Sequence, residues 1–206
     1  MIMFGLSSAT IWWVAAGIAV AAELAAHQGQ GRYEIGLEAC EQALQLDADS
    51  YDGNRVAGMC CIGLRRYDDA IRYFEKASSV VTTDFVAASF SVQCYEAIGD
   101  LDGMRAAAQR ALARVEKVIA AEPDHGRALG YGATLLATLR EPDRAKEWIE
   151  RGTLLDPNNT LVQFNYVCAL ARLHEIEPAL DLLATVIEKA SQGWLVWLDQ
   201  DTDLDP

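Results

Sequence analysis

The sequence predicts an all-α protein in which helix–turn–helix units stack one on the next. Three observations support this prediction. The chain is rich in Ala, Leu, Glu, Arg and Gln, which favour helices. It has no long alternation of Val, Ile and Thr of the kind that indicates strands. One pattern of small and large apolar residues returns at a spacing of 34 residues, and a fixed period of this length is typical of solenoids.

The repeat is clearest in two stretches, "YDGNRVAGMCCIGLRRYDDAIRYFEKASSVVTTD" (51–84) and "GRALGYGATLLATLREPDRAKEWIERGTLLDPNN" (126–159). Positions 8, 20 and 27 are small in both stretches, and position 24 is large and apolar: Gly58, Ala70, Ala77 and Phe74, then Ala133, Ala145, Gly152 and Ile149. Small residues let two helices approach closely, and large residues fill the space between neighbouring units. The register extends both ways and predicts five units, at 17–50, 51–84, 85–125, 126–159 and 160–193.

This pattern resembles the tetratricopeptide repeat (TPR), a helix–turn–helix family. The resemblance covers nearly all of residues 17–193. It implies a right-handed α-solenoid of about five units, with helical caps and a concave groove lined by the first helix of each unit. The chain departs from the family at position 8 of three units, where Leu24, Val92 and Val167 stand in place of the preferred Gly or Ala.

The third unit, 85–125, is seven residues longer than the others. The additional residues fall within "LARVEKVIAAE" and correspond to about two helical turns. An apolar stripe continues without interruption from Leu112 to Ile119. We therefore expect one lengthened helix over about 101–121, ended by Pro123, and no additional loop.

Residues 1–22 contain no ionisable side chain, and roughly 20 apolar residues can span a bilayer. The repeat register includes residues 17–28, however, and no Lys or Arg precedes the apolar run as in a signal peptide. We therefore expect a helix covered by protein. Residues 1–16, with Trp12 and Trp13, then form an N-terminal cap or a surface for self-association. A membrane anchor through residues 1–22 remains the alternative.

The last segment, 194–206, reads "WLVWLDQDTDLDP". Trp194, Leu195, Trp197 and Leu198 share one helical face, so we expect a short helix that covers the last unit, followed by an acidic tail. The segment is also similar to the ends of TPR regions in bacterial adenylate-cyclase-type multidomain signalling proteins. That similarity implies an alternative in which the chain is a regulatory or docking arm of a bacterial signalling enzyme.

The charge and the cysteines limit the partners and the location. The formal net charge is −13, from 30 acidic and 17 basic side chains, so we expect neither nucleic acid nor an anionic membrane as a partner. The five cysteines are odd in number and form no C-x-x-C pair: Cys40, Cys60, Cys61, Cys94 and Cys168. This usage favours a reducing, cytoplasmic location, with the thiols buried as small apolar groups.

The sequence carries no catalytic motif that we could identify. It has no G-x-x-x-x-G-K-[ST] loop, no G-x-S-x-G elbow and no H-E-x-x-H helix. His27, His125 and His174 lie far apart in the sequence, and Asp68 and Asp69 fall at an expected helix start, where acids complement the helix dipole. We therefore expect no catalytic residue, no metal site and no cofactor.

The expected groove is the remaining candidate for function. The TPR resemblance implies that positions 2, 5, 6, 9, 12 and 13 of each first helix point into it. Ten residues at such positions form our candidate peptide-binding set: Arg55, Met59, Ser89, Phe90, Gln93, Arg127, Tyr131, Thr134, Asn165 and Arg172. The Lys, Asn and Arg set with which one TPR subtype holds a C-terminal carboxylate cannot be assembled. We predict a non-enzymatic scaffold that binds a protein or peptide segment. A membrane-tethered assembly factor is a further alternative.

Overall fold

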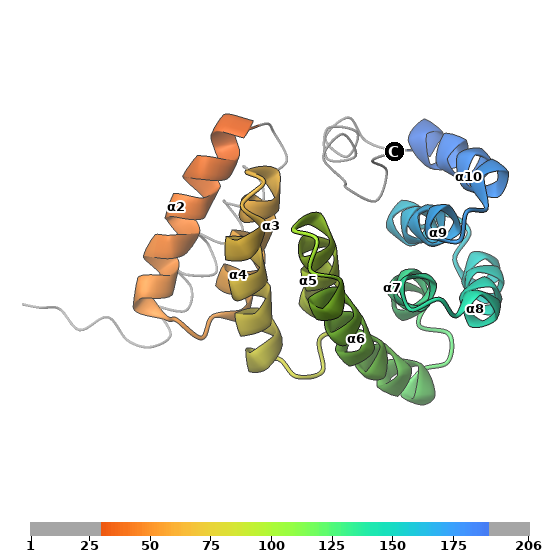
Figure 1. Ribbon diagram of the computed structural model, residues 1–206, viewed down its shortest axis with the longest axis horizontal. Helices are drawn as coiled ribbons and strands as arrows, with labels where there is room; N and C mark the ends of the chain where they lie inside the picture. The colour runs from red at the N-terminus through yellow and green to blue at the C-terminus, as the bar shows by residue number, and fades with distance from the viewer. Residues whose placement is uncertain (1–29, 190–206) are drawn as a thin grey trace, which may run out of the picture. The chain divides into compact units, whose positions relative to one another are not determined.

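The computed structural model describes residues 30–189, which form nine helices and, within that range, no strand (Figure 1). Helix accounts for 82% of these residues, and the predicted all-α class is confirmed. The chain divides into two compact units: unit 1 is Met1–Thr82, and unit 2 is Thr83–Pro206. The expected caps at 1–16 and 194–206, and the expected helix at 17–28, lie outside the described residues.

Unit 1 contains α2 (Gln30–Leu46), α3 (Tyr51–Gly63) and α4 (Tyr67–Val80), with α3 packed against both neighbours. The turn before α3 is held by polar side chains. The Ser50 hydroxyl caps α3 by accepting a hydrogen bond from an amide of its first turn, at 3.2 Å. The buried Asn54 amide donates to two carbonyls of the same turn, at 2.7 and 3.1 Å. The two bonds from Asn54 satisfy its own buried amide, and the Ser50 cap pairs a first-turn amide that has no partner inside the helix.

The small and large positions of the repeat meet directly in unit 1. Phe74 on α4 is fully buried against Gly58 on α3. A Cβ at Gly58 would lie 2.7 Å from the phenyl ring, a separation that real Cβ atoms do not adopt. The sequence pairing of a small position 8 with a large position 24 therefore has a steric cause.

None of the five cysteines forms a disulfide, and all five are buried, as the sequence predicts. Burial raises the pKa of Cys40, Cys60 and Cys61, which lie on α2 and α3, to about 12. Because the thiolate is the reactive form of cysteine, these side chains serve packing and are poor nucleophiles.

Unit 2 contains three helix pairs, each joined by a short turn. The pairs are α5 (Val86–Ala97) with α6 (Leu101–Ala121), α7 (Gly126–Thr138) with α8 (Pro142–Leu155), and α9 (Thr160–Arg172) with α10 (Ile176–Lys189). The helix α7 packs against α6, α8 and α9 and also touches α5. It therefore lies at the centre of this unit, and its neighbours bury nine of its 13 residues.

One turn geometry recurs inside the described helix pairs. A residue with positive φ follows the first helix at Arg65, Gly99, Arg140 and His174. The amide of the next residue donates to the carbonyl five residues earlier, at 2.8–2.9 Å, as in a Schellman motif. These turn residues are spaced by 34, 41 and 34 positions. The period in the sequence thus corresponds to a repeated local structure, and the longer spacing contains the seven additional residues.

The additional residues lengthen α6, which runs over 21 residues from Leu101 to Ala121, and the predicted single helix is confirmed. Asp100 caps its start by accepting a hydrogen bond from the Gly103 amide at 2.8 Å. Its buried stripe begins at Met104 and includes Val115. Within residues 30–189, no helix combines the length and the hydropathy that crossing a bilayer would require.

Candidate functional site

The ten candidate residues fall on the first helices of the described pairs. Arg55 and Met59 lie on α3 of unit 1, and the other eight lie on α5, α7 and α9 of unit 2. We call the partly exposed side chains of these three helices the first-helix surface of unit 2. In unit 1, Met59 is half-buried and the Arg55 side chain is 20% exposed, with its Nε 3.8 Å from Asp52 Oδ1.

An aromatic cluster with a cation lies on the first-helix surface. The Tyr131 ring on α7 meets the half-buried Phe90 ring on α5 edge-on, with centroids 6.4 Å apart, and the Phe85 ring at 5.6 Å. The exposed Arg127 guanidinium lies 5.8 Å from the centre of the same Tyr131 ring, which is a cation–π distance. Tyr131 itself is only 8% exposed. It supports Phe90 and Arg127, which are the more accessible members of the cluster.

Polar side chains join α7 to α9 beside this cluster. The Thr134 hydroxyl donates to the backbone carbonyl of Asn165 at 2.9 Å. The Asn165 Nδ2 is buried and has no hydrogen-bond partner among the described residues. Gly130 allows this approach, because a Cβ there would lie 3.3 Å from the Asn165 side chain. These residues come together through the close contact of the two first helices.

Two further candidates lie on α5. The Ser89 hydroxyl donates to the Phe85 carbonyl at 2.8 Å, and this internal bond occupies its proton. Gln93 follows one helical turn later and is half-buried. Both side chains add polar character to the first-helix surface without adding charge.

Arg172, the last candidate, forms an ion pair that the sequence reasoning missed. Its guanidinium binds Glu96 with both nitrogens, Nη2 to Oε2 at 2.5 Å and Nη1 to Oε1 at 3.2 Å. Glu96 lies on α5 and Arg172 on α9, 76 positions apart. Glu96 occupies position 12 of its unit, which is one of the positions expected to face the groove. The repeat register could therefore have included Glu96, but no acidic residue was chosen as a candidate.

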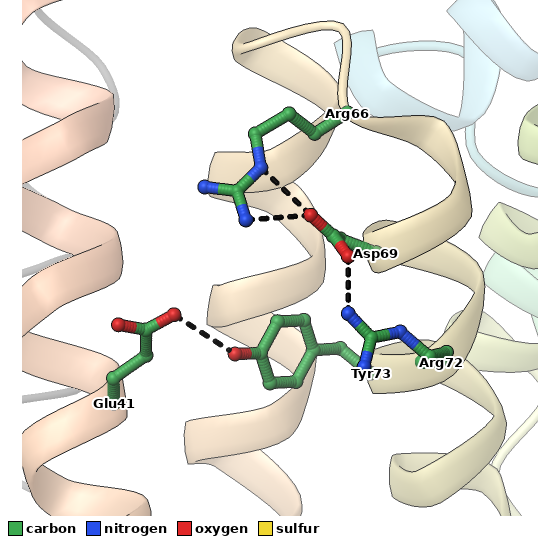
Figure 2. Close-up of polar contacts among 5 residues, drawn as sticks. All are labelled: Glu41, Arg66, Asp69, Arg72 and Tyr73. Atoms are coloured by element: carbon green, nitrogen blue, oxygen red, sulfur yellow. Dashed lines mark hydrogen bonds and ion pairs between the residues drawn. The ribbon is translucent and has the colours of Figure 1, made fainter.

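Unit 1 has two separate sets of polar contacts, which Figure 2 shows. The Asp69 carboxylate binds Arg72 and Arg66, the latter with Nε to Oδ2 at 2.7 Å, and these bonds hold the pKa of Asp69 below its usual value. Tyr73 on α4 donates to Glu41 on α2 at 3.2 Å, and burial raises its pKa to about 12. The first set lies in the first turns of α4 and the second joins α4 to α2, and none of the ten candidate residues takes part in either.

The other groups that could take part in catalysis or ligand binding either have structural partners or lie apart from the ten candidate residues. His125 caps α7 by accepting a hydrogen bond from the Ala128 amide, at 3.1 Å. Among residues 30–189, no three His, Cys, Asp or Glu side chains are placed to hold a metal ion. A surface cavity of about 440 Å³ lies beside α8, lined by Glu147, Glu150 and exposed leucines, but no candidate residue borders it.

The repeated turns, the helix pairs and the matched small and large residues define an all-α helical-repeat protein. Comparison with known proteins makes this class more specific. Residues 56–80 match the family model of the tetratricopeptide repeat. A search of curated proteins gave no significant match.

Three solved structures show the extent of the similarity. A thermophilic TPR protein of Thermus thermophilus has a TM-score of 0.59 at 15% identity, covering 84% of this chain and 91% of that one. PilF of Pseudomonas aeruginosa has a TM-score of 0.60 at 14% identity, and the match covers 88% of this chain and 79% of that one. MamA of Desulfovibrio magneticus RS-1 has a TM-score of 0.52 at 17% identity, and the match covers 85% of this chain and 94% of that one. The chain thus has the fold of TPR proteins, and at these identities the likeness establishes the fold alone.

Proposed function

We propose that this chain is a non-enzymatic interaction module that binds another protein, or a peptide segment of one, on the first-helix surface of unit 2. The observation that carries the proposal is the cluster of Phe90, Tyr131 and Arg127, two aromatic rings and a cation at neighbouring positions of α5 and α7. Aromatic and Arg side chains are the ones that most often dominate binding energy at protein interfaces.

The surroundings of this cluster support a peptide or protein as the ligand. Ser89, Gln93, Thr134 and Asn165 lie near it on the same three helices and provide uncharged donors and acceptors. A partly exposed aromatic centre with an uncharged polar border is the usual composition of a protein-recognition surface. For unit 1, taken by itself, we propose Arg55 and Met59 as secondary candidates.

The proposal includes two expectations drawn from the sequence, namely the division into five repeats and a cytoplasmic location. The two alternatives depend on other parts of the chain. The signalling-arm alternative rests on residues 194–206, and the membrane-tethered alternative rests on residues 1–22. Both segments lie outside residues 30–189, so no described contact favours either alternative over an independent interaction module.

The test begins with capture of partners by the full chain, followed by reconstitution of one complex from purified components. Titration calorimetry then gives its Kd. We expect Arg127→Glu and Phe90→Ala each to raise the Kd about tenfold or more. Lys117→Glu, an exposed change on α6, is the matched control and should alter the Kd less than about twofold. A Kd that responds to Lys117 and not to Arg127 or Phe90 would contradict the proposed surface.

A further inference from the structure

The surface cavity beside α8, which we call the α8 cavity, shares no lining residue with the first-helix surface. The helix α8 contributes Glu147, Glu150 and Leu154, which share one face at helical spacing. The turn after α6 contributes Pro123 and Asp124. The cavity volume of about 440 Å³ lies in the usual range for ligand sites, roughly 300–1,000 Å³. The α8 cavity can therefore admit side chains of a ligand.

The apolar part of its lining is unusually exposed. Leu154 is 84% exposed, the largest exposed fraction among the large apolar side chains of residues 30–189. Leu155, which follows it, is 45% exposed. Apolar side chains that gather in a concavity, unlike those scattered singly on a surface, are typical of binding sites. These two leucines therefore provide an apolar contact for a ligand.

The polar part of the lining is acidic. The carboxylates of Asp124, Glu147 and Glu150 are exposed and form no ion pair or side-chain hydrogen bond with another described residue. Other charges on the second helices are paired within the chain, as Arg144 is with Glu116 at 2.6 Å. The three carboxylates of the α8 cavity therefore remain available to a positive charge from outside.

The backbone around the cavity also favours a positive charge. The helix α6 ends at Ala121, two residues before Pro123, and α8 ends at Leu155. The last carbonyls of a helix point outward and attract cations. The chain itself places one cation here, since Arg151 Nη2 donates to the Pro123 carbonyl. Arg151 is the single basic residue among the described residues of the lining, so the lining keeps an excess of negative charge.

We propose that the α8 cavity is a second interaction surface, which binds a segment of a partner protein that carries an apolar side chain and a Lys or Arg side chain close together. The apolar side chain packs on Leu154 and Leu155, and the cation binds Glu147 and Glu150. Glu150 and Leu154 are four positions apart on α8, about 6 Å along the helix axis, which sets the separation of the two groups. The inference goes beyond the proposed function, because it adds a different surface with a different ligand chemistry.

The test uses a tetrapeptide of sequence LKKL, blocked at both ends, which is titrated into the full ¹⁵N-labelled chain and followed by NMR. We expect the largest amide shifts at Asp124, Glu150 and Leu154. Leu154→Ser should raise the Kd about fivefold, because it removes the most exposed apolar contact. Glu147→Lys combined with Glu150→Lys should raise it about tenfold or more, because attraction becomes repulsion. The blocked tetrapeptides LEEL and SKKS should each bind about tenfold more weakly than LKKL.

A matched variant excludes an effect of net charge alone. Glu34 and Glu38 are exposed on α2, and Glu34→Lys combined with Glu38→Lys changes the net charge by the same amount as the α8 double variant. It should change the Kd less than about twofold, because salt screens charges outside the contact. Equal losses from the two double variants, equal binding of SKKS and LKKL, or no measurable binding of LKKL would overturn the proposal.

Two further comparisons keep the result decisive. If the α8 double variant did not fold, Leu154→Ser and the SKKS peptide would still decide, since Leu154 is almost fully exposed. Phe90→Ala, on the first-helix surface, should leave the Kd of LKKL unchanged. Failure of this titration is therefore distinct from failure of the proposed function.

Discussion

The first and second helices of unit 2 differ in how they carry charge. The three first helices contain three charged residues in total, whereas α6, a second helix, contains six. The burial differs as well, since nine of 13 residues are buried on α7 and four of 14 on α8. A first helix has neighbours on more sides, so each polar group on it is harder to accommodate. The few charges there are therefore more informative about function than the many on the second helices.

The largest expected effect concerns the contact between a second helix and a first helix. Gly152 on α8 faces the fully buried Tyr166 of α9, and a Cβ at Gly152 would lie 1.6 Å from the Tyr166 hydroxyl oxygen. Gly152→Ala should lower the free energy of unfolding by about 3 kcal/mol, as overpacking does. Urea unfolding followed by circular dichroism measures it. Gly126→Ala is the control, because the nearest atom there is 3.6 Å away, and it should be neutral or stabilising. Similar losses for both variants would show that the packing around Tyr166 is loose.

The next prediction compares two ion pairs: Glu96 with Arg172 on first helices, and Glu116 with Arg144 on second helices. Glu96→Gln removes the charge from the bidentate contact with the largely buried Arg172 and should cost about 1–2 kcal/mol of unfolding free energy. Glu116→Gln should cost about 0.5 kcal/mol or less, because Arg144 is 43% exposed and keeps Glu141 at 2.6 Å. Urea unfolding of both variants checks the order. Equal costs would mean that burial does not strengthen the Glu96–Arg172 pair.

A third prediction concerns the turns that join first helices to second helices. Gly99 has a φ of 77°, and a Cβ added there would meet no atom within 4 Å. Gly99→Ala should therefore cost about 1 kcal/mol for backbone reasons alone. His174 has a φ of 60° in the equivalent turn, so His174→Gly should raise stability by about 0.5 kcal/mol. Thermal unfolding of the two variants should shift in opposite directions, and a shift of the same sign would refute the backbone explanation.

A smaller, pH-dependent effect is expected on α4, a second helix of unit 1. The hydrogen bonds from Arg72 and Arg66 lower the pKa of Asp69 from its ordinary value of 3.8. Its contribution is therefore present above the pKa of the unfolded chain and is lost as the pH falls through the lower folded pKa. Asp69→Asn should cost about 0.5 kcal/mol near neutral pH and almost nothing at about pH 2. Urea unfolding of both chains at several pH values tests this, and a difference that grows on acidification would contradict it.

The smallest expected effect comes from a hydroxyl group on α9. The Tyr166 hydroxyl is buried and has no hydrogen-bond partner among residues 30–189. Tyr166→Phe should therefore change the free energy of unfolding by less than about 0.5 kcal/mol, or increase it. Thr134→Val is the comparison, because it removes a hydroxyl that donates to the Asn165 carbonyl, and it should cost about 1 kcal/mol. A clear loss in Tyr166→Phe would indicate a partner for this hydroxyl, such as an ordered water.

The sequence predicts the fold well because its main determinants are local and periodic. The pairing of Gly58 with Phe74 appears as fixed positions within one unit, and the structure brings the two into contact. The lengthened α6 follows from an unbroken apolar stripe, and its predicted bounds of about 101–121 match the observed helix. The positive φ of Arg65, Arg140 and His174 was not predicted, because none of them is a glycine.

The candidate surface is less predictable because it depends on neighbours that are distant in the sequence. The helical register indicates which side of α7 Tyr131 occupies, but not that Phe85 and Phe90 leave the ring only 8% exposed. The pairing of Glu96 with Arg172 was missed for the same reason. Arg172 lies 76 positions after Glu96, and no local pattern connects the two.

The length of α6 has a consequence for how such chains can change over time. Seven residues make nearly two full turns, so an insertion of seven rotates the following side chains by only about 20°. The point at which the chain leaves α6 toward α7 therefore keeps nearly the same angular position around the helix axis, although the helix is longer than its counterparts α8 and α10. An insertion of five residues would instead rotate that point by about 140°. In this architecture an insertion must preserve the direction around the helix axis in which the chain continues, whereas helix length can change in steps of about two turns.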